Sequence, residues 1–280
     1  MSFSADWLAL REPADHAAVN PDVQAALTAR FAQRQSITVV DLGSGAGSNL
    51  RGTCVALPKQ QHWTLVDYDP KLLAAAMATL AQWADTAASE GNMLLLTKAE
   101  KHLTVQFREA DLSTGDYAGV LAKADLVTAA ALFDLVSIQN IEALAKTIVS
   151  NRQTFLTVLT YDGHANWQPV HPADAAIRDA FNAHQRTDKG FGPASGAGGT
   201  TALAKAFYAR GFRVLRGTSP WVVDKRYGTL RHDLDTGFAN AVRETGKVNE
   251  ADVASWLAMR TSSEDGVSII GHEDLLAVPF

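Results

Sequence analysis

Short apolar runs rich in β-branched residues alternate with longer segments of helical spacing over much of the first half of the chain. Runs of this length predict buried strands, and the longer segments predict helices. Residues 92–101 carry no clear pattern. The alternation predicts an α/β fold with a doubly wound, mostly parallel sheet. The predicted strands lie within residues 38–42, 63–70, 105–112, 125–134 and 155–163, and the predicted helices at about 49–57, 71–90 (clearest over 72–88), 117–122 and 139–150.

Helical patterns also occupy the two ends of the chain. Residues 5–35 are predicted to be helical, with breaks at Pro13 and Pro21. The later part of the chain predicts helices over 173–186, 202–210, about 230–244 and about 250–262, with a loop over 187–196. A sixth strand is expected from residue 212, continuing through 221–223, and a final strand over 267–278.

Composition narrows the possible functions. The 280 residues are 47% hydrophobic, carry a net charge of −5 and include one cysteine, Cys54. A chain of this kind suits one large domain and does not suit a disulfide framework or a nucleic-acid groove. No apolar run approaches membrane-spanning length, and the first residues lack the layout of a signal peptide. We therefore expect a cytoplasmic protein with no nucleic-acid or membrane partner.

The loop after the first strand carries the most specific chemistry. It reads Asp41-Leu42-Gly43-Ser44-Gly45-Ala46-Gly47, and its glycines let the backbone approach a ligand without a Cβ in the way. A dinucleotide loop has a different glycine spacing and directs a helix N-terminus at a pyrophosphate. The acid at Asp41 would repel phosphate and attract a cation or an amino group. A nicotinamide-dependent reductase is therefore the least favoured interpretation.

This stretch resembles the first motif of the class I S-adenosylmethionine-dependent methyltransferases. Further acids follow in the family's order, with Asp67 24 residues after Gly43 at the end of the second strand and Asp111 at the end of the third. The resemblance implies that Asp67 pairs with ribose hydroxyls, that Asp111 and Leu112 hold the adenine, and that the fourth strand ends beside the reactive methyl group. The cofactor-binding residues that it implies are Asp41, Gly43, Ser44, Gly45, Gly47, Asn49, Asp67, Tyr68, Asp111, Leu112 and Ala130.

Candidate catalytic residues follow the fourth and fifth strands and lie in the inserted segment after them. They are Asp134, Tyr161, His164, His184 and Arg186. Either histidine is suited to act as a general base, and Arg186 to bind a substrate carboxylate. In the family a leading helix commonly lies across the cofactor cleft, so Arg11, Asp15 and His16 are further candidates. Asp134, Asp162 and Asn166 superficially resemble the metal ligands of some O-methyltransferases, but their spacing does not match and no metal is expected.

The resemblance implies one methyltransferase domain, residues 1–280, with a seven-stranded sheet. Within it we expect a helical cap over 1–36, a cofactor-binding core over 37–163, and insertions at 164–200 and 225–265 that form a substrate lid. The expected activity is methyl transfer from S-adenosylmethionine to oxygen, nitrogen or carbon of a small molecule, by a monomer or homodimer. Two alternatives keep the cofactor: non-methyl chemistry (a lyase, cyclase or aminopropyl transfer), or a non-catalytic binding subunit.

Overall fold

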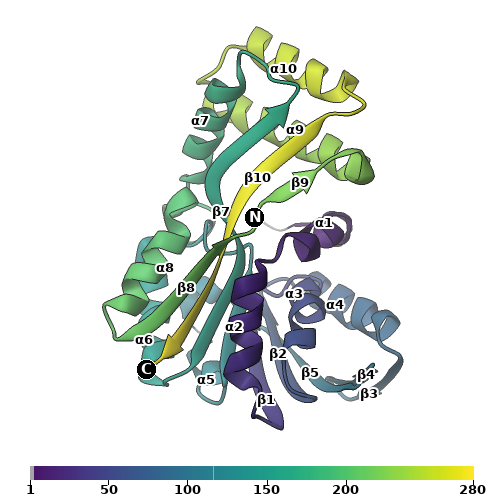
Figure 1. The fold of residues 1–280 in the computed structure, drawn as a ribbon, viewed down its shortest axis with the longest axis vertical. Coiled ribbons are helices and arrows are strands. Elements are labelled where there is room, and N and C mark those ends of the chain that lie inside the picture. The colour runs from purple at the N-terminus through teal and green to yellow at the C-terminus, as the bar shows by residue number, and fades with distance from the viewer. Residues whose placement is uncertain (1–2, 116) are drawn as a thin grey trace.

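A single large mixed sheet organises the fold of the computed structural model, which describes residues 3–115 and 117–280 (Figure 1). The strand order is β3-β4-β5-β2-β1-β6-β7-β10-β8, and β9 pairs with β10. The strands are β1 (Ser36–Leu42), β2 (Gln60–Asp67), β3 (Thr86–Glu90), β4 (Met93–Lys98), β5 (Lys101–Glu109), β6 (Leu126–Ala130), β7 (Thr154–Gln168), β8 (Phe212–Thr218), β9 (Trp221–Val223) and β10 (Val267–Pro279).

Helices cover both faces of this sheet. Several begin at side chains that accept a hydrogen bond from the first turn, as Asn20, Asp69 and Ser137 do for α2, α4 and α6. The helices are α1 (Ala5–Ala18), α2 (Pro21–Phe31), α3 (Ser48–Thr53), α4 (Pro70–Trp83), α5 (Ala118–Leu121), α6 (Ile138–Ser150), α7 (Asp174–Gln185), α8 (Gly199–Tyr208), α9 (Gly228–Thr245) and α10 (Glu250–Ser262), with short 3-10 turns η1 (Cys54–Ala56), η2 (Leu112–Thr114), η3 (Gly196–Gly198) and η4 (Lys225–Tyr227).

The centre of the sheet confirms the predicted fold class. Strands β5, β2, β1, β6 and β7 are parallel neighbours, and β10 lies antiparallel between β7 and β8. The seven strands expected from the sequence are therefore present, with the antiparallel pair at the end of the chain. The carboxyl ends of β1, β2, β5 and β6 meet at one edge of the sheet, which is where ligands bind in open α/β folds.

Three further strands extend the sheet beyond the predicted seven. The helix expected to reach residue 88 ends at Trp83, and β3 then pairs antiparallel with β4, which pairs with β5. This hairpin contains the untyped segment and turns at Gly91, whose φ of +63° suits a glycine. The predicted sixth strand is also divided, because β8 ends at Thr218 and β9 begins at Trp221.

Pro13 does not break the first helix, contrary to the sequence-based expectation. It lies inside α1, whereas Pro21 opens α2 as its first residue. A proline in a helix interior removes one hydrogen bond and crowds the preceding turn. Side chains on both sides of Pro13 hold this helix in place: Glu12 pairs with Arg51, and Asp15 pairs with Arg11. These contacts offset the cost of the proline.

The second half of the chain forms an additional layer outside the parallel core, here called the upper layer, which consists of α7, α9, α10 and the outer parts of β7 and β10. In Figure 1, β7 runs upward out of the core and β10 returns antiparallel beside it, and α7, α9 and α10 pack around the upper parts of these two strands. The indole of Trp167 on β7 makes edge contacts with Phe238 of α9 and Trp256 of α10, at ring-centre distances of 5.3 and 5.1 Å. This aromatic cluster fixes the insertions against the long strands rather than over the sheet edge.

Candidate functional site

The glycine loop adopts the backbone geometry that its sequence predicts. Gly43, Gly45 and Gly47 have φ values of +65°, +52° and +77°, a region that side chains with a Cβ rarely adopt. A Cβ on Gly45 would lie 2.9 Å from Leu8 of α1, and one on Gly47 would meet Leu80 of α4 at 3.4 Å. Gly43 and Gly45 thus line the space in front of the loop. Gly47 instead allows α3 and α4 to approach each other.

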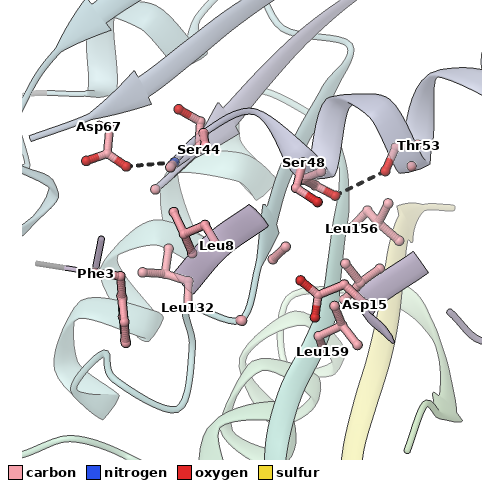
Figure 2. Close-up of a pocket in the computed structure, with 18 of the residues that line it drawn as sticks. Phe3, Leu8, Asp15, Ser44, Ser48, Thr53, Asp67, Leu132, Leu156 and Leu159 are labelled. Atoms are coloured by element: carbon pink, nitrogen blue, oxygen red, sulfur yellow. Dashed lines mark hydrogen bonds between the residues drawn. The ribbon is translucent and has the colours of Figure 1, made fainter. Parts of the chain in front are cut away.

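A cavity of about 290 Å³ opens along the carboxyl ends of the parallel strands (Figure 2). Its wall includes nine of the eleven predicted cofactor residues: Gly43, Ser44, Gly45, Asn49, Asp67, Tyr68, Asp111, Leu112 and Ala130. Asp41 and Gly47 do not line it. The tips of four neighbouring strands are therefore brought to one cavity.

Asp67 ties the glycine loop to the end of β2. Its carboxylate accepts hydrogen bonds from the backbone N–H groups of Gly45 at 2.8 Å and Asp69 at 3.0 Å (Figure 2). The side chain is 5% exposed, and burial raises the pKa of this carboxyl against the lowering effect of these N–H groups. It faces the cavity, and each of its oxygens retains a lone pair for a ligand hydroxyl.

Asp41 is a supporting residue, which corrects the expectation that it contacts the ligand. It is fully buried and accepts a 2.8 Å hydrogen bond from Asn49, whose amide also donates to Thr128 at 3.1 Å. Desolvation raises the pKa of Asp41 to about 7, against the lowering effect of the Asn49 hydrogen bond, and the nearby Asp67 charge raises it further. The N-cap residue of α3 is Gly47.

Asp111 and Leu112, to which the resemblance assigns the adenine, line the cavity together with Tyr68. Asp111 is exposed and accepts a hydrogen bond from Ser113 N–H at 2.8 Å, which starts the turn η2. The side chain of Ser113 and then its backbone N–H lower the pKa of Asp111 by hydrogen bonding to the carboxylate. Leu112 follows it in the cavity wall, and Tyr68 stands half-exposed beside Asp67. The carboxylate can accept a hydrogen bond from an amino group, and the neighbouring apolar side chain can pack on a flat ring.

Helix α1 lies across the glycine loop, as expected from the family. Arg51 of α3 donates to Glu12 at 2.6 Å and to the Ala46 carbonyl at 3.1 Å, so one arginine binds the helix and the loop together. Leu8, Arg11, Asp15 and His16 all line the cavity. The helix therefore shields the site from solvent and supplies part of its wall.

The hydrogen bonds of His16 determine its neutral tautomer. Its Nε2 lies 3.1 Å from the carbonyl oxygen and 3.2 Å from the hydroxyl of Ser48; because the carbonyl oxygen can only accept, we assign the proton of the neutral ring to Nε2. Nδ1 is then the basic nitrogen. This side chain has the chemistry of a general base at the cavity wall.

The five predicted catalytic residues do not line the cavity. Asp134 and Tyr161 are buried, the first with its pKa raised by burial to about 6 and the second donating its hydroxyl to Asn182 at 2.8 Å. His164 is mostly exposed beside Asp162, and His184 pairs with Glu244 at 2.9 Å. Arg186 lies at the C-terminal end of α7. These positions give them no contact with a ligand in the cavity.

Of the two insertions expected to form a lid, one reaches the cavity, and only at its loop. Lys189, Gly190 and Phe191 line the cavity mouth. Within the described residues, α9 and α10 supply none of the wall. In place of a broad lid, the structure uses α1 and this short loop.

Much of the remaining wall was missed by sequence reasoning. Val23 and Leu27 lie in a segment predicted only as helix, and Leu156, Val158 and Leu159 in one predicted only as strand, yet all five line the cavity. Periodicity identifies such side chains as buried, but it cannot tell whether they face another element or a cavity. Further lining residues that the sequence did not indicate are Phe3, Val19, Gln24, Leu132 and Leu135.

Neither a metal cluster nor a membrane-spanning helix is found within the described ranges, 3–115 and 117–280. No group of three or more histidine, cysteine, aspartate or glutamate side chains there is placed to hold a metal ion. No helix within those ranges has the length and apolar character needed to span a membrane.

Comparisons with known proteins give likenesses among solved structures only. No protein-family model matches the chain, and no curated protein does. A SAM-dependent methyltransferase from Geobacter sulfurreducens, solved with S-adenosyl-L-homocysteine, is 17% identical over the whole of both chains, with a TM-score of 0.46. A cyclopropane synthase from Mycobacterium tuberculosis is 10% identical, covering 98% of this chain and 94% of its own, with a TM-score of 0.49. Likenesses at this level do not establish what this chain binds.

Proposed function

We propose that the chain is an enzyme that transfers a methyl group from S-adenosylmethionine to a small molecule. The observation that carries the proposal is the junction of Asp67 with the glycine loop at the cavity wall. There a buried carboxylate lies against a backbone segment that bears no Cβ at Gly43 or Gly45. This arrangement suits a ribose and a thioether chain, and it lacks the helix N-terminus with dinucleotide glycine spacing that a pyrophosphate would need.

Each part of the cofactor has a partner in the cavity wall. Asp67 is placed to accept from the ribose hydroxyls, and Asp111 with Leu112 to hold the adenine. Asp41 and Asn49 fix the start of α3 from behind, so that the loop keeps its shape when empty. The hydroxyl of Ser44, in the cavity wall, is buried and has no hydrogen-bond partner among the described residues, which leaves a polar group beside the loop for the methionine part.

When bound, the cofactor supplies a methyl group on a sulfonium, so the acceptor gains a bond to carbon as the carbon–sulfur bond breaks and a thioether leaves. The chain's task is then to align acceptor and donor and to exclude water, which can supply roughly 7–11 kcal/mol in a well-oriented reaction. Helix α1 and Phe191 cover the cavity for this purpose. His16 is placed to accept a proton where the acceptor carries one.

Calorimetric titration with S-adenosylhomocysteine and mass spectrometry of the cofactor products test the proposal. We expect binding by the wild type and weaker binding by Asp67→Ala. Turnover of S-adenosylmethionine with a pool of small acceptors should release S-adenosylhomocysteine. Methylthioadenosine as the product would indicate aminopropyl-type or cleavage chemistry, and binding without turnover would indicate a non-catalytic subunit. No binding by the wild type would overturn the proposal.

A further inference from the structure

The cavity continues past the glycine loop into a second compartment, here called the inner lobe. It lies between α2, the α3–η1 segment and the sheet, and its aliphatic wall consists of Val23, Leu27, Ala56, Leu156, Val158 and Leu159. Figure 2 shows Leu156 and Leu159 grouped with Thr53 and Asp15, apart from Asp67 and Phe3 on the other side of Leu8. The predicted cofactor residues apart from Asn49 do not belong to this wall.

The polar groups at the inner lobe are already occupied by one another. Thr53 donates a hydrogen bond to the side-chain oxygen of Asn49 at 3.1 Å. The side-chain NH₂ of Asn49 donates one hydrogen bond to Asp41 and one to Thr128. His16 is bonded to the carbonyl of Ser48. A ligand entering the lobe meets mainly the hydrocarbon parts of these side chains. Two groups are exceptions, since neither the side-chain amide of Gln24 nor Nδ1 of His16 makes a hydrogen bond with the described residues.

The charges at the entrance of the lobe also cancel. The guanidinium of Arg11 binds both carboxylate oxygens of Asp15, with Nε–oxygen distances of 2.9 and 3.2 Å, and it stacks over the ring of Trp221 at 4.9 Å. The two side chains are 12% and 10% exposed. A charged ligand would have to break this buried pair or be buried without a counter-charge, both of which are costly.

We infer that the inner lobe binds the hydrocarbon part of the methyl acceptor, and that the acceptor is an uncharged, largely aliphatic small molecule. This inference rests on the proposed function for the identity of the donor, but the binding preference can be measured without it. The lobe adjoins the glycine loop through Ser48 and Asn49, so an occupant of the lobe ends beside the donor. An uncharged polar end, such as a hydroxyl, would find the free amide of Gln24.

Three probes of equal chain length separate the possibilities: 1-hexanol, hexanoate and hexylamine, titrated by calorimetry with and without saturating S-adenosylhomocysteine. We expect hexanol to bind at least about tenfold more tightly than either ion, because the ions carry an unpaired charge into an apolar wall. Tighter binding of hexanoate would mean that Arg11 forms an anion site, and tighter binding of hexylamine that Asp15 forms a cation site. Either result, or no hexanol binding, overturns the inference.

Filling the lobe provides the structural control. Ala56→Leu should weaken hexanol binding by about tenfold, because the larger side chain would displace roughly two methylene groups of the bound hexanol from the lobe. The neighbouring Val55, 63% exposed and outside the cavity, gives the matched variant Val55→Leu, which should bind hexanol as the wild type does. Leu27→Phe serves as a second filling variant if Ala56→Leu does not fold.

The filling variants also separate this inference from the proposed function. Both should bind S-adenosylhomocysteine unchanged. If they lose it while remaining folded, the lobe holds the cofactor rather than the acceptor, and the inference is overturned. A wild type that binds hexanol but not S-adenosylhomocysteine would overturn the proposed function and leave the apolar preference of the lobe standing.

Discussion

The carboxylate of Asp67 and the backbone N–H of Gly45 are joined by a 2.8 Å hydrogen bond that links the tips of two neighbouring strands across the cavity. The same carboxylate therefore shapes the loop and faces the ligand. We expect Asp67→Ala to weaken S-adenosylhomocysteine binding by about 10- to 100-fold, because hydrogen bonds to a charged group are each worth ~1.5–3 kcal/mol. Asp67→Asn keeps an oxygen for Gly45 and should lose less. Calorimetry measures both, with Asp233→Ala on the exposed surface of α9 as the control. Equal affinity in all three variants would remove Asp67 from the site.

A side chain at Gly45 should disturb the loop in two separable ways. Gly45→Ala would place a methyl group 2.9 Å from Leu8 and hold a non-glycine residue at φ +52°. The backbone term alone costs about 1–2 kcal/mol, so we expect a lower free energy of unfolding in urea and weaker cofactor binding. Adding Leu8→Ala removes the contact but not the strain. In the Leu8→Ala background, Gly45→Ala should therefore lower the free energy of unfolding and the cofactor affinity by less than it does in the wild type. Recovery to the full Leu8→Ala value would show that the backbone strain has no effect.

The pH dependence of stability should report the buried carboxyl of Asp41. Its pKa is raised from 3.8 in the unfolded chain to about 7 in the folded protein by desolvation, so the folded state favours the protonated form. The group is neutral in both states below about pH 4 and ionised in both above about pH 7. Its contribution to stability is therefore highest at acid pH and falls as the pH rises through that window.

Asp41→Asn tests this because it keeps the acceptor for Asn49 and cannot ionise. Urea unfolding at pH 5 and pH 8 should show the variant gaining on the wild type by a few kcal/mol between the two pH values. Other buried carboxyls shift the pH profile of both proteins, so the difference between variant and wild type is the quantity to follow. A difference that does not change with pH would contradict the raised pKa.

The pair formed by Glu12 and Arg51 should control how firmly α1 covers the cavity. Arg51 is 8% exposed, and it binds Glu12 and the Ala46 carbonyl together. Removing one partner of a buried pair leaves an uncompensated charge and can cost about 3–5 kcal/mol. Glu12→Gln should increase hydrogen exchange in α1 and weaken S-adenosylhomocysteine binding.

Glu100→Gln is the matched control for that prediction. Glu100 pairs with Lys59 on the surface, where the side chains are 63% and 68% exposed, and such pairs contribute little. Its variant should leave both measurements unchanged. If Glu12→Gln also leaves hydrogen exchange in α1 unchanged, packing of Leu8 and its neighbours is sufficient to hold the helix.

Local pattern was enough to predict the parallel core and the strand-end residues that line the cavity. Apolar runs ending in Asp67 and near Asp111 have few alternatives to buried strands, and strand ends of a parallel sheet meet at one edge. The hairpin β3–β4 was missed because alanine-rich residues continue past Trp83 and mask the end of α4. Alanine favours helix intrinsically, and pairing with β4, which itself pairs with β5, overrides that preference at Thr86–Glu90.

The acceptor side shows where local pattern stops. His164 and His184 were chosen for their chemistry and their place after predicted strands, but β7 continues to Gln168 and carries the following segment into the upper layer. The residues that line the inner lobe, such as Leu27 and Leu156, have side chains that any core could contain. The sequence by itself determined the glycine loop and the order in which acidic residues follow the predicted strands, because both depend on spacing along the chain. Only the tertiary structure decided which helix covers the loop and which aliphatic side chains face a cavity, because these depend on contacts between segments far apart in sequence.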